Sequence, residues 1–194
     1  MNYDFTSIIE RKGMDAIAVD LVGTSKFGIG APKEGFDIIP MWIADMNFPA
    51  CPTIPEAMIE RAKHLTYGYF MPREEYFASI INWHEKRSGV TGMLAEHIGY
   101  SNGVLGGVLA AVNVLCSRGD KVLLHSPTYT GFTGPLENNG YHIIHSPLKL
   151  DEQGVWRMDF ADMEEKIVAN KIHCAIFCSP HNPCGRVWER WEIE

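Results

Sequence analysis

Residues 179–186 combine residue types that can hold a polar side chain toward a ligand. Their two prolines restrict the backbone, and each disfavours a helical conformation at the residue before it, so Ser179 and Asn182 are expected to be extended. Gly185 then allows a turn without a Cβ clash. Because the apolar run 172–178 predicts a buried strand, Asn182 would present its amide at a strand's carboxyl end, where open α/β sheets bind ligands. An ordinary proline–glycine turn is the competing interpretation.

A second segment, residues 101–107, reads SNGVLGG at the passage from a predicted strand to a predicted helix. Unpartnered N–H groups and the positive end of the helix dipole collect at such a helix start, which suits a phosphate. The glycine spacing matches neither GxGxxG nor the Walker A motif, so a phosphate monoester fits better than a dinucleotide or a nucleoside triphosphate. A helix of small residues packed closely on the sheet is an equally open alternative.

Tyr129 follows the next predicted strand, in the segment SPTY at 126–129. A tyrosine at a strand's carboxyl end can lay its ring on a flat heteroaromatic ligand, whereas a lone tyrosine is more often a core residue with a bonded hydroxyl. The three segments matter more together than singly. Three strand ends would carry a phosphate-type turn, an aromatic ring and a proline-fixed asparagine.

The elements that must position these side chains alternate along the chain from about residue 95. Such alternation indicates βαβ units with mostly parallel pairing, and therefore an α/β fold. Residues 1–37 have weak periodicity and are expected to form an arm. The predicted strands lie near 97–101, 121–125, 141–146 and 172–178, and the predicted helices near 52–64, 74–87, 103–117, 129–138 and 159–169.

Composition narrows the class of protein. The 194 residues are 46% hydrophobic, which is enough to bury a sizeable core, and the net charge of −7 argues against nucleic-acid or anionic-membrane partners. Neither a signal peptide nor a spanning segment is recognisable, and the five cysteines form no CxxC pair, so we expect a cytoplasmic protein with reduced thiols. No metal site is expected, because structural roles are favoured for the following histidines and cysteines: His142, His145, His181, Cys174 and Cys178.

The motifs SNGV at 101–104, PTY at 127–129 and NPCGR at 182–186 resemble those of the class I/II aminotransferases, pyridoxal-phosphate (PLP) enzymes of fold type I. The segments MWIADMNF at 41–48 and YGY at 67–69 are more specifically similar to the MalY/PatB-type C–S lyases, or cystathionine β-lyases. The resemblance implies an incomplete PLP-dependent transferase-like large domain, a mostly parallel sheet with flanking helices, preceded by an N-terminal arm. Residues 1–50 would be the arm and part of the small domain, and 51–194 the first part of the PLP-binding large domain.

The same resemblance implies roles for individual residues. The amides of Gly103, Val104 and Leu105 would hold the PLP phosphate. Tyr129 would stack on the pyridine ring, and Asn182 would hydrogen-bond its phenolic oxygen.

Other implied roles lie farther from the ring. Tyr67 would reach the phosphate of a neighbouring subunit's cofactor, which implies a homodimer. Ala44 and Asp45 would line the substrate entrance. Arg186 would brace the loop that carries Asn182.

The resemblance also implies residues that follow the chain's last position. The Schiff-base lysine, an aspartate for the pyridinium nitrogen and an arginine for the substrate carboxylate are expected beyond Glu194, so no catalytic residue is assigned within the chain. The Ser146–Lys149 spacing matches S-x-x-K, but its context predicts an exposed strand exit rather than an acylating motif.

Three functions follow. The first is a PLP-dependent β-lyase that cleaves cysteine S-conjugates to a thiol, pyruvate and ammonia. The second is an aminotransferase. The third is a non-catalytic PLP-binding or interaction fragment, since the 194 residues alone are expected to be inactive.

Overall fold

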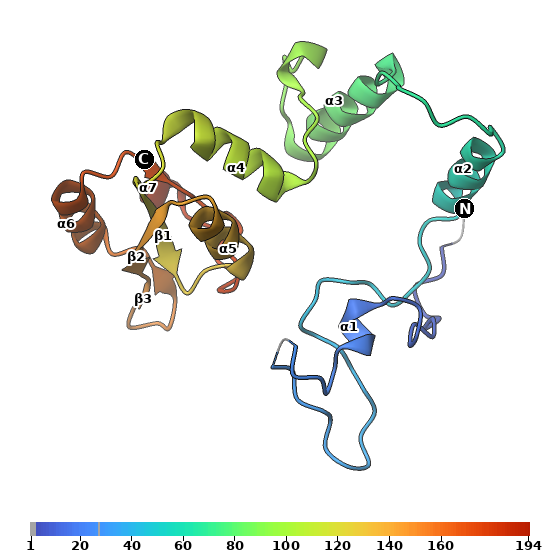
Figure 1. The fold of residues 1–194 in the computed structure, drawn as a ribbon, viewed down its shortest axis with the longest axis horizontal. Coiled ribbons are helices and arrows are strands. Elements are labelled where there is room, and N and C mark those ends of the chain that lie inside the picture. Colours follow the sequence, from blue (N-terminus) through green and yellow to red (C-terminus); the bar gives the residue numbers. More distant parts are fainter. Residues whose placement is uncertain (1–2, 27) are drawn as a thin grey trace. The chain divides into compact units, whose positions relative to one another are not determined.

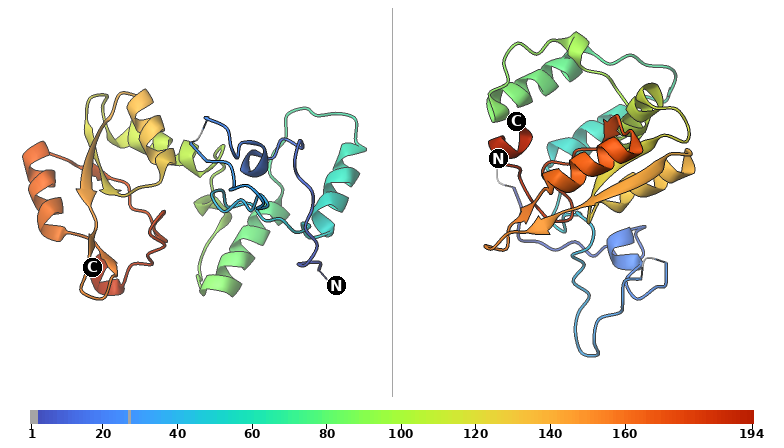
Figure 2. Two further views of the ribbon diagram at one scale, coloured as in Figure 1. Left: turned by 90° about the horizontal axis from the view of Figure 1, so that it is seen from below. Right: turned by 90° about the vertical axis from the view of Figure 1, so that its left-hand side faces the viewer.

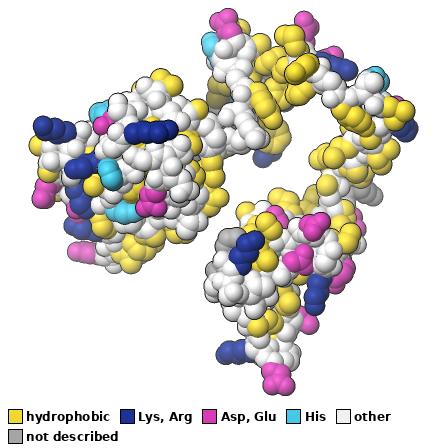
Figure 3. Space-filling model, in the orientation of Figure 1, with side chains coloured by type: hydrophobic (Ala, Val, Ile, Leu, Met, Phe, Trp, Pro, Cys, Tyr) yellow, Lys and Arg dark blue, Asp and Glu magenta, His cyan; other side chains and the backbone are white. Residues whose placement is uncertain are grey.

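The computed structural model describes residues 3–26 and 28–194. The chain divides into two compact units, Met1–Pro72 and Arg73–Glu194. The described residues of the first unit form two helices, α1 (Ile17–Asp20) and α2 (Thr53–Ala62), with long irregular segments between them (Figure 1). Apolar side chains of α2, such as Met58 and Ile59, lie exposed, and hydrophobic atoms follow this helix at the surface in Figure 3.

The second unit is built on a parallel sheet whose strand order is β2–β1–β5. Its central strand is β1 (Lys121–Ser126), and its neighbours are β2 (His142–Pro147) and β5 (Cys174–Ala175). Four consecutive residues of β1, 122–125, are buried, because helices cover both faces of the sheet. Figure 1 shows α5 (Thr130–Asn138) and α6 (Phe160–Asn170) on opposite sides of the strands.

The two faces of β1 enter different cores, as the alternation of side chains along a strand requires. Val122 and Leu124 pack with α5 and α4 (Val104–Leu115) in a cluster that includes Val112, Leu136 and Tyr141. A second cluster joins Leu148, Met158 and Trp188 beyond the other face. His125 belongs to this side, since its ring lies 6.1 Å from that of Trp188.

Most predicted elements of the second unit are present, with shifted ends. They include α3 (Glu74–Ser88), which ends at Gly89 in a left-handed conformation, a common helix stop. Helix α6 is capped by Asp159, whose carboxylate accepts a hydrogen bond from Asp162 N at 3.3 Å. Both views in Figure 2 show the helices beside the strands they cover.

Two predicted strands differ from the structure. The strand near 97–101 is wrong: a 3₁₀ turn, η1 (Ala95–His97), is followed by extended backbone at Ile98, and no described segment pairs with it. The apolar run 172–178 forms a ladder only at Cys174 and Ala175. A segment that favours extended backbone becomes a strand only where a neighbouring strand supplies hydrogen bonds. The residue types alone therefore predicted more strand than either segment has.

An antiparallel pair of two-residue strands, β3 (Lys149–Leu150) and β4 (Trp156–Arg157), was not expected from the sequence. The helix that the sequence indicates after the Asn182 turn is present as one terminal turn, α7 (Arg190–Ile193). All are too short to show a periodicity. None of the described helices is long and apolar enough to cross a membrane.

Candidate functional site

The loop that carries Asn182 is a tight turn closed by main-chain hydrogen bonds. His181 N donates to Arg186 O at 2.8 Å, and Gly185 N donates to His181 O at 2.6 Å. Gly185 has a φ of 65°, a conformation that few other residues adopt without strain. Asn182 lies within this turn and is exposed, and the orientation of its amide toward a ligand stays a prediction.

Buried aromatic rings support the turn from below. His181 is 2% exposed and Trp188 is 4% exposed, and their rings meet edge to face with centroids 5.6 Å apart. Trp188 Nε1 also donates to Cys178 O at 2.8 Å, which fixes the strand exit. Burial lowers the pKa of both His181 and the neighbouring His125, so both imidazoles are neutral at pH 7.

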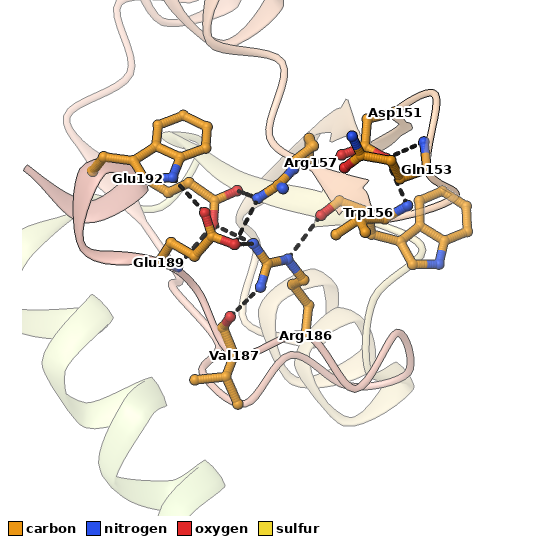
Figure 4. A network of polar contacts seen from close by, with 10 residues as sticks. Asp151, Gln153, Trp156, Arg157, Arg186, Val187, Glu189 and Glu192 are labelled. Atoms are coloured by element: carbon orange, nitrogen blue, oxygen red, sulfur yellow. Dashed lines mark hydrogen bonds and ion pairs between the residues drawn. The ribbon is translucent and has the colours of Figure 1, made fainter.

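Arg186 ties the turn to a network of charged side chains (Figure 4). Its Nε donates to Trp156 O at 3.0 Å, and its terminal nitrogen lies 2.6 Å from Glu192 Oε2. The Glu192 side chain is fully buried and also faces Arg157 at 3.3 Å. The network therefore joins the turn to β4 and α7, in agreement with the bracing role expected of Arg186.

The first turn of α4 is formed by main chain alone. Gly103 precedes it with a φ of 81° and a ψ of 157°, and no side chain caps the helix. The N–H groups of Val104, Leu105 and Gly106 lack intrahelical partners, as in every helix start, and this turn holds no acidic residue. Gly103 N, which was also expected to bind the phosphate, instead donates to Ser101 O at 2.8 Å. Val104 is 82% exposed, so the helix start is open to an anion.

Tyr129 lies against a glycine that sequence analysis did not single out. A Cβ added to Gly131 would come within 2.7 Å of Tyr129 Cζ and 3.0 Å of Leu105 Cδ1. Only glycine allows the ring to lie this close to α5, and the ring itself is 39% exposed. A glycine lowers the stability of a helix relative to alanine, so a glycine near the start of α5 suggests a packing reason. That signal could have identified Gly131 from the sequence.

These contacts bring part of the predicted site together. Leu105 and Tyr129 meet around Gly131, which joins the start of α4 to the carboxyl end of β1. Asn182 follows β5, which runs parallel to β1 with Ile176 N bonded to Leu123 O at 3.0 Å. Tyr129 and Asn182 therefore leave the sheet at the same edge.

Three predicted site residues lie in the other unit. Asp45 is exposed and paired with Arg11 at 2.7 Å, and Ala44 is exposed beside it. Tyr67 donates its hydroxyl to Ala62 O at 3.0 Å and lies under the Arg61 guanidinium. Their roles toward a cofactor or substrate stay predictions.

The S-x-x-K segment forms no Ser–Lys pair. Ser146 is buried and donates its hydroxyl to Asp162 Oδ2 at 2.7 Å, whereas Lys149 is paired with Asp159. The segment does leave β2, as expected, but the burial of Ser146 and Leu148 shows that it is only partly exposed. The interpretation that it is not an acylating motif agrees with these contacts.

Curated relatives match almost the whole chain. Cystathionine beta-lyase PatB of Bacillus subtilis is 36% identical over 193 residues, which cover 100% of this chain and 47% of that protein. Protein MalY of Escherichia coli is 28% identical, over 99% of this chain and 47% of that protein. The chain thus spans about half the length of the curated relatives it matches.

Solved structures show the same architecture. The PLP-bound C–S lyase of Staphylococcus hominis superposes with a TM-score of 0.82 at 32% identity, over 100% of this chain and 47% of that one. Cystalysin of Treponema denticola, which contains PLP, gives a TM-score of 0.84 at 30% identity with the same coverage. The expected α/β fold of type I is therefore confirmed.

The family model for aminotransferase class I and II matches residues 37–194. This span includes the turn of Asn182, the start of α4 and Tyr129. Because it takes in most of the sequence, the chain belongs to the class I and II aminotransferase family.

Proposed function

We propose that the carboxyl edge of the β1–β5 sheet binds pyridoxal phosphate. The observation that supports the proposal is the approach of Leu105, at the open start of α4, to the Tyr129 ring at Gly131. The exposed Asn182 follows β5, which runs parallel to β1, and so lies toward the same edge of the sheet. A phosphate monoester, a flat ring and a ring oxygen are the groups that these three features suit. The PLP bound to the Staphylococcus hominis and Treponema denticola proteins supports the assignment.

The chain's own residues would bind and orient the cofactor. Main-chain N–H groups at 104–106 would hold the phosphate, the Tyr129 ring would stack on the pyridine, and Asn182 would donate its amide N–H to the phenolic oxygen. When bound, PLP supplies an electron sink that stabilises negative charge at the α-carbon of an amino acid. The buried support of the Asn182 turn keeps this donor in place, and preorganised donors lose little entropy on binding.

For the whole protein, we propose a C–S β-lyase acting on cysteine S-conjugates. With cystathionine and water, the products would be homocysteine, pyruvate and ammonia. The cystathionine beta-lyase activity in the name of PatB supports this choice. An aminotransferase is the second candidate, because the family model that matches is that of the class I and II aminotransferases. Tyr67 would serve a neighbouring subunit's site in a homodimer.

Binding of the phosphate can be tested at one main-chain donor. Val104 is the first residue of α4, where proline is tolerated and where the ψ of Gly103 suits a following proline. Val104→Pro removes a single N–H, whereas the control Val104→Ala keeps it. A hydrogen bond to a charged group contributes about 1.5 to 3 kcal/mol, so Val104→Pro should weaken PLP binding about ten- to hundredfold.

The comparison with pyridoxal, which lacks the phosphate, completes this test. Val104→Pro should leave pyridoxal binding unchanged. Equal PLP affinity in the proline and alanine variants would contradict the assignment of the helix start to the phosphate.

Product stoichiometry separates the two reactions. A lyase releases pyruvate, ammonia and thiol in equal amounts without an acceptor. An aminotransferase needs a 2-oxo acid and releases no ammonia. Turnover that depends on a 2-oxo acid would replace the lyase proposal while leaving the cofactor proposal intact.

A further inference from the structure

Three potential metal ligands gather at the edge of the sheet opposite Asn182. Cys116 follows α4, Asp120 precedes β1, and His173 precedes β5, so all three lie at the amino ends of the parallel strands. The Cys116 thiol, an Asp120 carboxylate oxygen and a His173 ring nitrogen lie within 4.8 Å of one another. The length of β1 separates them from the proposed cofactor site.

The spacing within this cluster is close to that of a metal site. His173 Nε2 lies 3.7 Å from Asp120 Oδ2. Bond lengths usual for zinc place the ligand atoms of a tetrahedral site about 3.4 to 3.8 Å apart. The other two separations are at most 4.8 Å, so ligation would bring the Cys116 thiol closer to its two partners by up to about 1 Å.

The main chain around the ligands is well fixed. Asp120 Oδ2 accepts a hydrogen bond from Ser117 N at 2.8 Å, and Asp120 O accepts one from His142 N at 2.9 Å. Gly119 N donates to Gly140 O at 2.7 Å, which holds the turn against the start of β2. Hydrogen bonds to a carboxylate ligand orient it toward a metal.

The donor set selects the kind of ion. One thiol, one imidazole and one carboxylate suit Zn²⁺, whereas Mg²⁺ and Ca²⁺ prefer oxygen ligands alone. A fourth position is open to solvent, because the His173 and Asp120 side chains are 54% and 36% exposed.

We propose that Cys116, Asp120 and His173 form a zinc-binding site at the amino edge of the sheet. Zinc would take the place of the contact between His173 Nε2 and Leu115 O, which now measures 3.2 Å. The proposal departs from the expectation of no metal site. That expectation rested on histidines and cysteines other than His173 and Cys116. His173 lies 53 residues after Asp120 in the sequence, so their proximity follows from the β1–β5 pairing.

Cobalt titration of the full chain in reducing buffer tests the site. Co²⁺ bound to a thiolate gives a near-ultraviolet charge-transfer absorption, and a tetrahedral site gives strong visible bands. We expect one equivalent of Co²⁺ to produce both signals and one equivalent of Zn²⁺ to remove them. Titration without a thiolate band would overturn the proposal.

Matched variants identify the ligands. His173→Gln and Asp120→Asn should each weaken Zn²⁺ at least about tenfold, and Cys116→Ala should abolish the charge-transfer band. His142→Gln, at an exposed position of β2, and Cys178→Ser should leave both affinity and spectrum unchanged. Loss of the band in Cys178→Ser, or equal Zn²⁺ affinities for His173→Gln and His142→Gln, would overturn the assignment. Because His173 is exposed, its variant is expected to keep the wild-type far-ultraviolet circular dichroism.

Discussion

The Asn182 turn and the first turn of α4 belong to the same proposed site, but they are held in place differently. The Asn182 turn rests on buried side chains, Trp188 and Glu192 among them, that come from later in the chain. The start of α4 depends on its own main chain and is largely exposed. A donor that must orient a ring needs fixed geometry, whereas a phosphate can be held by helix N–H groups present in any sequence.

The comparison predicts the largest stability effect beneath Asn182. Trp188→Ala removes a 4% exposed side chain together with its hydrogen bond to Cys178 O, and should lower the free energy of unfolding by about 3 to 5 kcal/mol. Urea denaturation measures this change. Trp83→Ala is the control, since Trp83 is 61% exposed. Equal losses in the two variants would mean that Trp188 does not support the turn.

A smaller loss is expected from the charged network. Glu192→Gln keeps the volume of the side chain but leaves Arg186 and Arg157 without the buried negative charge, at a cost of about 2 to 3 kcal/mol. Glu194→Gln, which alters an exposed pair with Arg190, should change stability by less than about 0.5 kcal/mol. If Glu192→Gln lowered the free energy of unfolding no more than Glu194→Gln does, Arg186 would hold the turn without the Glu192 carboxylate.

The buried histidines predict a pH dependence. Burial lowers the pKa of His125 and His181 in the folded chain, so the unfolded chain binds more protons once the pH falls below about 6.5. Stability should be fully present above that pH and decrease as the pH falls toward the folded-state pKa values. At pH 5.5 each histidine can account for at most about 1.4 kcal/mol.

Substitution of these rings isolates their contribution. A double variant, His125→Phe with His181→Phe, should reduce the slope of stability against pH between 7 and 5.5, measured by urea denaturation. An unchanged slope would assign the pH dependence to other groups.

The smallest stability effect is predicted at the start of α4. Val104→Pro removes an N–H that has no intrahelical partner, so the free energy of unfolding should change by less than about 0.5 kcal/mol. Thermal and urea unfolding beside Val104→Ala measure the difference. A large loss would mean that this N–H has a structural role, and the contrast with the Asn182 turn would fail.

Local sequence features were enough to predict much of the fold and the candidate edge. Apolar runs and helix periodicity located β1, β2, α4, α5 and α6, and the prolines and Gly185 predicted the turn at Asn182. The alternation of strands and helices placed Tyr129 after β1 and Asn182 after β5, whereas the segment before α4 is not a strand in the structure. These features depend on neighbouring residues, and such signals are readable along the chain.

Contacts between distant residues could not be read in this way. The close approach of Tyr129 and Leu105 at Gly131, and the pairing of Arg186 with Glu192, depend on packing of separate elements. The strand expected near 97–101 failed for a related reason, since its ladder needs a partner that its own sequence does not specify. His173 and Asp120 meet only because β5 pairs with β1.

The most direct test of the cofactor site is an assigned ¹H–¹⁵N spectrum of the full chain, recorded during titration with PLP. We predict that the amide signals of Val104, Leu105 and Gly106 shift together with the side-chain NH₂ of Asn182. Signals at the opposite edge, such as those of Gly119 and His173, should stay unchanged. Shifts confined to lysines, or found equally at both edges of the sheet, would contradict the proposal that PLP binds at the carboxyl edge.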